Sequence, residues 1–370
     1  MAAGTARASH MVTLLDRYLA RQILWFTLLV MAVLVCLAGL FVFIEQQSDV
    51  GVGSYGMFEA VFVTLLRLPQ QAFQLLPVGA LIGALVGLGN LARGSELVVI
   101  RAAGVSVARV AVAAAAAGLL MFAGGALLGE VLAPPLEAYA DQIRTFAKYN
   151  DLSFAGRAGV WVKDGERIVS IQRQSADNVF GGVYVYVVSV GADGRQRLVV
   201  LARADRAQLV AGRKWRLTNY QDSLLGDDGV ATRHLATFDV DTGINPEFLG
   251  AAVVNPDALP VRGLYRYVQH LKANGLESRS WEVALWARIA RSLSTILMCM
   301  LAVPFVFGPL RSAGAGSRTV IGIIVGVVYF LINRTLENSG DVYGLNPLLV
   351  AWVPPALLAA ATGIAIARVR

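Results

Sequence analysis

The hydrophobic and polar positions divide the chain into two blocks of long apolar runs, separated by a segment of alternating pattern. A helix needs about 20 apolar residues to cross a bilayer, and most of the runs reach that length. Each block holds three runs, which predicts six membrane-spanning α-helices in a three-plus-three arrangement. The runs extend over about residues 19–44, 57–90, 105–134, 281–307, 319–332 and 345–367.

Basic residues mark one side of this predicted membrane protein, because short cytoplasmic loops carry an excess of Lys and Arg. They precede the first run, occupy the loop that contains Arg93, Arg101 and Arg109, and return at Arg311, at Arg318 and at the C-terminus. We therefore place both termini and these two loops in the cytoplasm. The segment between the third and fourth runs then lies outside.

In that outer segment, residues 150–260, apolar and polar residues alternate with a period of two, and the long apolar runs are absent. Lys163-Asp164-Gly165 stands between two alternating stretches, and an Asp-Gly pair in this setting is a strong hairpin signal. Short strands with regular turns predict an all-β domain, which could be a sandwich, a jelly roll or an open barrel. We expect a periplasmic, jelly-roll-like domain.

These patterns divide the chain into four parts. Residues 1–10 are expected to be an added leader outside the fold, and residues 11–149 carry the first three spans. Residues 150–260 form the β-domain, and residues 261–370 carry the last three spans. Because proline lacks the N–H that a helix interior needs, Pro134 and Pro135 are expected to interrupt the third helix.

Composition agrees with a membrane protein and argues against other classes. The chain is 56% hydrophobic and 15% charged, and its net charge is +7; soluble domains carry about 25% charged residues. The positive charge is explained by the basic residues of the cytoplasmic loops, so it does not indicate a nucleic-acid partner. Cys36 and Cys299 lie inside apolar runs, which favours packing over a disulfide or a metal site.

The sequence carries no motif for catalysis or for energy conversion. It has no phosphate-binding loop, no metal-binding His or Cys spacing and no nucleophile elbow. We expect no catalytic residue, metal or cofactor in this chain. If the protein moves a substrate uphill, ATP and magnesium must act on a partner ATPase.

The cytoplasmic stretch from about residue 91 to residue 104 is the feature that suits such a partner. Ser95 is a candidate cap and Gly104 a candidate stop for a short helix of about three turns. An acidic residue near the helix start with apolar residues behind it suits a groove on a soluble ATPase. An ordinary connector is the alternative. The expected contacts are Glu96, Arg93, Leu97, Ile100 and Arg101.

Small residues recur at four-residue spacing in two of the runs. Gly79, Gly83 and Gly87 lie in the second run, and Gly322 and Gly326 lie in the fifth. This spacing lets two membrane helices approach closely, so we expect packing or gating faces there, although glycine is also common in membrane helices generally.

Several segments together resemble the LptF/LptG family of lipopolysaccharide export permeases, and more closely its LptG branch. The resemblance covers essentially residues 11–370 in order. Its specific motifs are Leu15-Asp-Arg-Tyr18, Gly83–Gly104, Gly159–Gly165, Pro256-Asp-Ala-Leu259 and Phe305–Arg311.

The resemblance implies a multi-pass protein of the Gram-negative inner membrane that pairs with an LptF-type permease on a dimer of the ATPase LptB. The single-span protein LptC joins beside the first span, and spans one and five form lateral gates. The complex extracts lipopolysaccharide and passes it to periplasmic β-jellyroll domains and an LptA-type bridge protein. By position, Glu96 matches the coupling-helix carboxylate of the family.

The chain departs from the better-known members where they place lysines at the outer end of the first span. Val42, Ser48 and Asp49 stand there instead. The candidate contacts for lipid phosphates therefore become Arg67, Arg144 and Lys148, since Arg offers a fork that binds two oxygens. From the sequence, Arg67 either reaches the headgroups or faces a polar cavity.

Two other functions compete with lipid export. A mechanotransmission-type permease would move no lipid and only work a periplasmic domain, and a large apolar cavity between spans one, two and five would argue against it. A membrane enzyme acting on lipids is disfavoured by the missing nucleophile and metal motifs.

Overall fold

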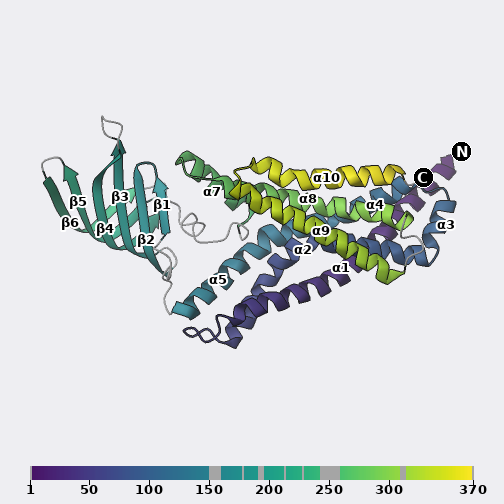
Figure 1. Ribbon diagram of the computed structural model, residues 1–370, viewed down its shortest axis with the longest axis horizontal. Helices are drawn as coiled ribbons and strands as arrows, with labels where there is room; N and C mark the ends of the chain where they lie inside the picture. The colour runs from purple at the N-terminus through teal and green to yellow at the C-terminus, as the bar shows by residue number, and fades with distance from the viewer. Residues whose placement is uncertain are drawn as a thin grey trace.

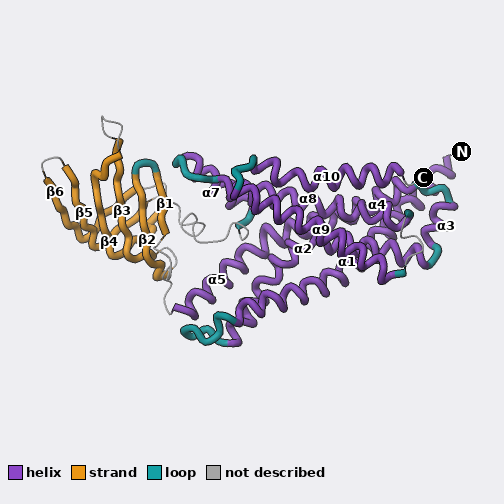
Figure 2. The backbone as a smooth tube through the Cα atoms, viewed as in Figure 1, coloured by secondary structure: helices purple, strands orange, loops and turns teal. Residues whose placement is uncertain are grey.

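The computed structural model describes residues 2–149, 160–176, 179–190, 196–211, 214–226, 229–241, 259–308 and 314–368. A bundle of long helices occupies one end of an elongated molecule, and a single β-sheet occupies the other (Figures 1 and 2). Both chain ends lie at the end of the bundle far from the sheet (Figure 1).

Among the described residues, six helical stretches are long and apolar enough to cross a membrane, which confirms the three-plus-three prediction. The expected leader continues the first helix from residue 2 onward. The helices are α1 (Ala2–Gln47), α2 (Met57–Arg93), α3 (Glu96–Ala102), α4 (Val107–Leu127), α5 (Ala133–Tyr149), α7 (Val261–Ala273), α8 (Arg279–Phe307), α9 (Ala315–Val342) and α10 (Pro347–Arg368).

Helix α2 is the centre of the bundle, since 72% of its most apolar stretch is buried. A Cβ added to Gly83 would strike the backbone of Thr27, and one added to Gly87 would lie 3.1 Å from the carbonyl oxygen of Gln22, so α1 packs closely along this glycine stripe. A Cβ on Gly79 would strike the side chain of Met31, which also lies on α1. The small-residue prediction holds for α2.

Gly322 and Gly326 of α9 also pack against α2, on Ile82, Leu85 and Val78. Their stripe therefore serves helix packing within this chain, the first of the two roles expected for it, and does not face outward. An ion pair adds a second link for α9, because Arg291 of α8 donates to Glu337 at 3.0 Å.

The third span does not break at its prolines, so the expected interruption is wrong. A π-helical turn (Leu128–Leu132) joins α4 to α5, and the N–H of Ala133 donates to the carbonyl of Leu128. A regular helix would leave the carbonyls opposite Pro134 and Pro135 without donors. The wide turn accommodates the prolines, and the guanidinium of Arg288 donates to the carbonyl of Gly129.

The inserted domain is an antiparallel six-stranded sheet with neighbours in sequence order. The hairpin predicted at Asp164-Gly165 is confirmed, with Gly165 at φ +61° as the first loop residue. The described strands form one continuous hydrogen-bonded sheet. They are β1 (Val160–Asp164), β2 (Arg167–Ala176), β3 (Val179–Val190), β4 (Gln196–Ala211), β5 (Lys214–Gly226) and β6 (Gly229–Asp241).

The sheet touches the helical part through its first turn. The backbone N–H of Gly165 donates to the side-chain oxygen of Asn274 at 2.7 Å, just beyond the end of α7. The β-domain thus lies next to the hairpin formed by α7 and α8 (Figure 1).

Candidate coupling and lipid-handling sites

Helix α3 is shorter than the sequence suggested, because residues 91–93 belong to α2 and α3 has seven residues. Ser95 does not cap it: this residue is left-handed at φ 61°, and its side chain makes no capping bond. The stop at Gly104 is confirmed. Gly104 has φ +92°, its N–H donates to Arg101 at 2.9 Å, and the N–H of Val105 donates to Ile100 at 3.3 Å.

Three contacts hold α3 against the ends of the spans. The Tyr18 hydroxyl of α1 donates to Glu96 at 2.8 Å, and the Arg101 guanidinium lies 5.7 Å from the centre of the Phe307 ring at the end of α8. Leu97 is 2% exposed and belongs to the main apolar core. The short helix is therefore fixed to α1 and α8.

The outward face of α3 differs from the expected contact set. Leu97 cannot meet a partner because it is buried, and Ile100 packs partly against the same core. Val98 and Val99 are exposed instead, at 47% and 66%. Together with the exposed Arg93, Glu96 and Arg101, they give an apolar patch with charged edges.

A second polar link joins α1 to α4 close to the first. Arg109 at the start of α4 pairs with Asp16 of α1, and its Nη2 lies 2.5 Å from the Asp16 carboxylate. Asp16 and Tyr18 lie on the same turn near the start of α1. Asp16 links this turn to α4, and Tyr18 links it to α3.

The helices α1 and α9 expose most of their apolar surface. Only 17% of the most apolar stretch of α1 and 11% of that of α9 is buried. On α1, large side chains such as Trp25, Leu29 and Phe41 are exposed. Lipid or another membrane protein must cover these two faces.

The predicted phosphate contacts are already paired with carboxylates. Arg67 lies 2.5 Å from Asp141 and 3.3 Å from Glu137, and Arg144 lies 2.6 Å from Asp49. Lys148 belongs to α5, but its side chain lies outside the described residues. These ion pairs join α2, α5 and the end of α1, so a phosphate at either arginine would compete with a carboxylate.

Sequence reasoning missed the pair that joins the third span to the fourth. Arg288 is 3% exposed, donates to Glu130 at 2.7 Å and lies 4.9 Å from the centre of the Phe73 ring. The second oxygen of Glu130 accepts the N–H of Val261 at 2.6 Å. The start of α7, which returns the chain from the β-domain, is thereby fixed to the π-helical turn.

One face of the β-sheet carries an apolar cluster and a shallow hollow. The ring centres of Phe180 and Trp215 lie 5.2 Å apart within it. Burial raises the pKa of the Tyr220 phenol on this face to about 12, so its hydroxyl stays protonated at neutral pH. The hollow is lined mainly by Val169, Ile171, Val183, Ala207, Trp215 and Leu217.

Comparison with known proteins gives a consistent result along the whole chain. The family model described as lipopolysaccharide export system permease LptF/LptG matches residues 17–368. The chain is 33% identical over 349 residues to the LptG permease protein of Haemophilus influenzae, which covers 94% of this chain and 96% of that relative. It is also 33% identical over 344 residues to LptG of Escherichia coli K12, which covers 92% and 94%.

Proposed function

Because this chain belongs to the LptF/LptG family of lipopolysaccharide export system permeases, we propose that it is one permease subunit of an ATP-driven lipopolysaccharide exporter. It spans the Gram-negative inner membrane with both termini in the cytoplasm and the β-sheet in the periplasm. ATP and magnesium act on a partner ATPase, an LptB-type dimer, and this chain hydrolyses nothing itself.

The observation that carries this proposal is the attachment of α3 to α1. Glu96 accepts a hydrogen bond from Tyr18, while Val98 and Val99 point away from the core. A groove on the ATPase would cover the two valines, which removes apolar surface from water. A displacement of α3 would then act on α1 through Glu96 and on α8 through Arg101.

The exposed faces of α1 and α9 support pairing with a second, LptF-type permease. Both helices pack on α2 and leave most of their apolar surface uncovered by this chain. We assign these sides to an apolar cavity between the two permeases, where the acyl chains fit, and to a contact with LptC beside α1. Closure of the cavity expels the lipid.

The outer parts supply an exit for the lipid. Its phosphates meet Arg67, Arg144 and Lys148 by exchange with the carboxylates that now hold the two arginines. Its acyl chains pass to the apolar face of the β-sheet around Trp215, which keeps them out of water, and from there to an LptA-type bridge.

Copurification tests this proposal. The chain is expressed with its candidate partners and purified by a tag on α10, and the bound ATPase and lipopolysaccharide are measured. Val99→Asp is expected to reduce the bound ATPase about tenfold, because a charge enters an apolar contact. The matched control Val52→Asp changes an exposed valine of the loop between α1 and α2 and is expected to keep the ATPase. Equal ATPase with both variants contradicts the assignment of α3, and a complex without lipopolysaccharide favours the mechanotransmission alternative.

A further inference from the structure

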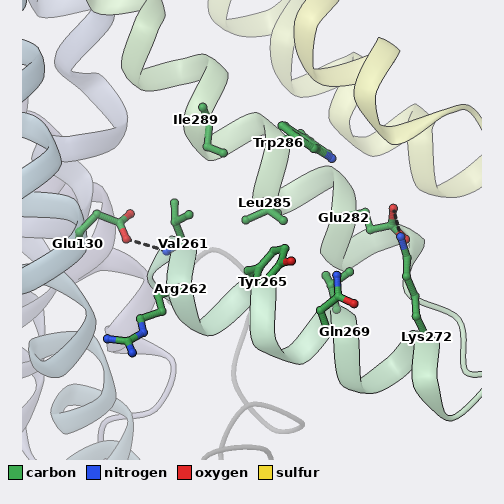
Figure 3. Close-up of a pocket in the computed structure, with 11 residues that line it drawn as sticks. Glu130, Val261, Arg262, Tyr265, Gln269, Lys272, Glu282, Leu285, Trp286 and Ile289 are labelled. Atoms are coloured by element: carbon green, nitrogen blue, oxygen red, sulfur yellow. Dashed lines mark hydrogen bonds and ion pairs between the residues drawn. The ribbon is translucent and has the colours of Figure 1, made fainter.

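Among the described residues, two cavities of similar volume lie apart from α3 and from the apolar face of the β-sheet. One is the groove between α7 and α8, of about 520 Å³. Most of its charged side chains bond within the chain, since Lys272 pairs with Glu282 and Glu130 accepts the N–H of Val261 (Figure 3). The other, which we call the polar hollow, has a volume of about 560 Å³ and lies on the sheet face opposite the apolar cluster. Its lining is polar throughout, so it is the stronger candidate for a polar ligand.

The polar hollow forms where three neighbouring strands lose their regular alternation at the same level. Successive buried side chains are there three residues apart, where a regular strand spaces them by two. They are Phe180 and Val183 in β3, Ala204 and Ala207 in β4, and Leu217 and Tyr220 in β5. The register aligns these positions, because Ala204 pairs with both Val183 and Tyr220. Each strand thus places two consecutive residues on the opposite face at this level, and irregularities of this kind recur beside binding sites.

Two residues with left-handed backbones accompany this irregularity. They are Gly182 in β3, at φ +62°, and Asn219 in β5, at φ +55°. Asparagine tolerates this conformation because its short polar side chain can bond locally. Here its amide donates to the carboxylate of Asp205 in β4, and its oxygen lies 2.7 Å from Nε2 of His234 in β6. The polar groups of the hollow are therefore held in place across three strands.

The charges of the polar hollow leave one positive charge over. The guanidinium of Arg203 lies 3.6 Å from the carboxylate of Asp205 and 6.0 Å from the centre of the Tyr184 ring, and both groups orient it. Arg206 is exposed, and its guanidinium pairs with no carboxylate in the part of the chain that the structure describes. Two arginines therefore share one carboxylate, which suits an anionic ligand.

We propose that the polar hollow binds a phosphorylated saccharide, with its phosphate on Arg203 and Arg206. An arginine fork binds two phosphate oxygens. The side chains of Asp205, Thr218 and Asn219 can donate to and accept from sugar hydroxyl groups. A bare phosphate would leave these three side chains unused, and a neutral sugar would leave Arg206 without an anion.

This site is separate from the one proposed for acyl chains, because the apolar cluster lies on the other face of the sheet. The ligand has two possible sources, which share the same chemistry. One is the sugar part of lipopolysaccharide, an assignment that rests on the proposed export function, and the other is a free sugar phosphate. Binding to the hollow is measured without ATP or export, so its failure leaves the export function standing.

Calorimetric titration of the purified full chain in detergent tests the proposal. The probes are the sugar part of lipopolysaccharide freed of its acyl chains, the same oligosaccharide without its phosphates, glucose monophosphate and inorganic phosphate. We expect the first probe to bind at least tenfold more tightly than the dephosphorylated oligosaccharide and than inorganic phosphate. Weaker binding of glucose monophosphate assigns the site to the cargo, and equal binding assigns it to a free sugar phosphate. No binding, or equal binding of inorganic phosphate or of the dephosphorylated oligosaccharide, overturns the proposal.

Single variants locate the binding. Arg206→Gln is expected to weaken it about tenfold, as for the loss of a hydrogen bond to a charged group. The matched control Arg216→Gln changes an exposed arginine of β5 that pairs with Asp239 at 2.9 Å and lies outside the lining, and it should keep the affinity. Asn219→Gly keeps the left-handed backbone, removes the amide and should weaken binding about threefold. Equal affinities of Arg206→Gln and Arg216→Gln contradict the assignment of the hollow.

Discussion

The hydroxyl of Tyr18 donates a 2.8 Å hydrogen bond to the carboxylate of Glu96, across 78 positions of the sequence. It joins the start of the first membrane span to the short helix α3. A bond to a charged group contributes about 1.5 to 3 kcal/mol, but this pair is exposed, so we expect the lower end of that range. A movement of α3 can therefore act on α1 directly through this bond.

Tyr18→Phe removes only this bond and is expected to weaken coupling. The ratio of lipopolysaccharide released to ATP hydrolysed should fall about three- to tenfold, while the complex stays assembled. Both rates are measured in vesicles that contain the complete exporter. Tyr343→Phe changes an exposed tyrosine at the other side of the bundle and serves as the control. An unchanged ratio in Tyr18→Phe would mean that this bond transmits nothing.

Gly83→Ala is expected to separate α1 from α2, because its Cβ would strike the backbone of Thr27. Overpacking of this kind costs about 1 to 3 kcal/mol. The melting temperature of the purified complex should fall by roughly 3 to 8 °C. Gly124→Ala places the same methyl group on α4, where nothing lies within 4 Å, and should not lower it. Equal shifts would contradict the close packing.

The membrane helices followed from the sequence because their signal is local. The apolar runs predicted six spans, and the glycine spacing of α2 predicted a close approach to another helix, which is α1. One local inference was wrong, because Pro134 and Pro135 are accommodated by a π-helical turn and do not interrupt the helix.

The pairings between distant residues did not follow, because nothing in a local pattern specifies them. Arg288 and Glu130 are 158 positions apart, and the two arginines expected at lipid phosphates are matched with Asp141 and Asp49. The sequence-based prediction placed the buried face of α3 toward the partner for a related reason. The seven residues of α3 include five apolar ones, so only the neighbouring helices decide that Leu97 is buried and Val99 is exposed.

Arg288→Met is expected to destabilise the fold by about 2 to 3 kcal/mol, because Glu130 then keeps a charge without its partner in a partly buried site. Unfolding of the purified chain in detergent measures this. The double variant Glu130→Gln with Arg288→Met should lose less than the sum of the two single variants. Arg279→Met removes an exposed arginine 3.8 Å from Glu277 and should cost no more than about 1 kcal/mol. If the losses of stability in Glu130→Gln and in Arg288→Met add up exactly in the double variant, the pairing of these two residues is contradicted.

Leu217→Gln tests the apolar face of the β-sheet as the receiver of acyl chains. Leu217 is 3% exposed within the apolar cluster, whereas Leu201 lies exposed on β4. With a photo-crosslinker in place of Val183, Leu217→Gln is expected to reduce lipopolysaccharide adducts severalfold, because a polar group there opposes the binding of apolar chains. Leu201→Gln should have little effect, and an equal loss in both variants would remove this face from the route.

The coupling role of α3 is tested most directly with Glu96→Ala in vesicles that contain the assembled exporter. The variant removes the carboxylate that Tyr18 holds and keeps Val98 and Val99 on the surface. ATP hydrolysis and lipopolysaccharide release are followed in the same sample. We predict that hydrolysis continues and that release falls at least tenfold. Release at the wild-type rate per ATP would contradict the account.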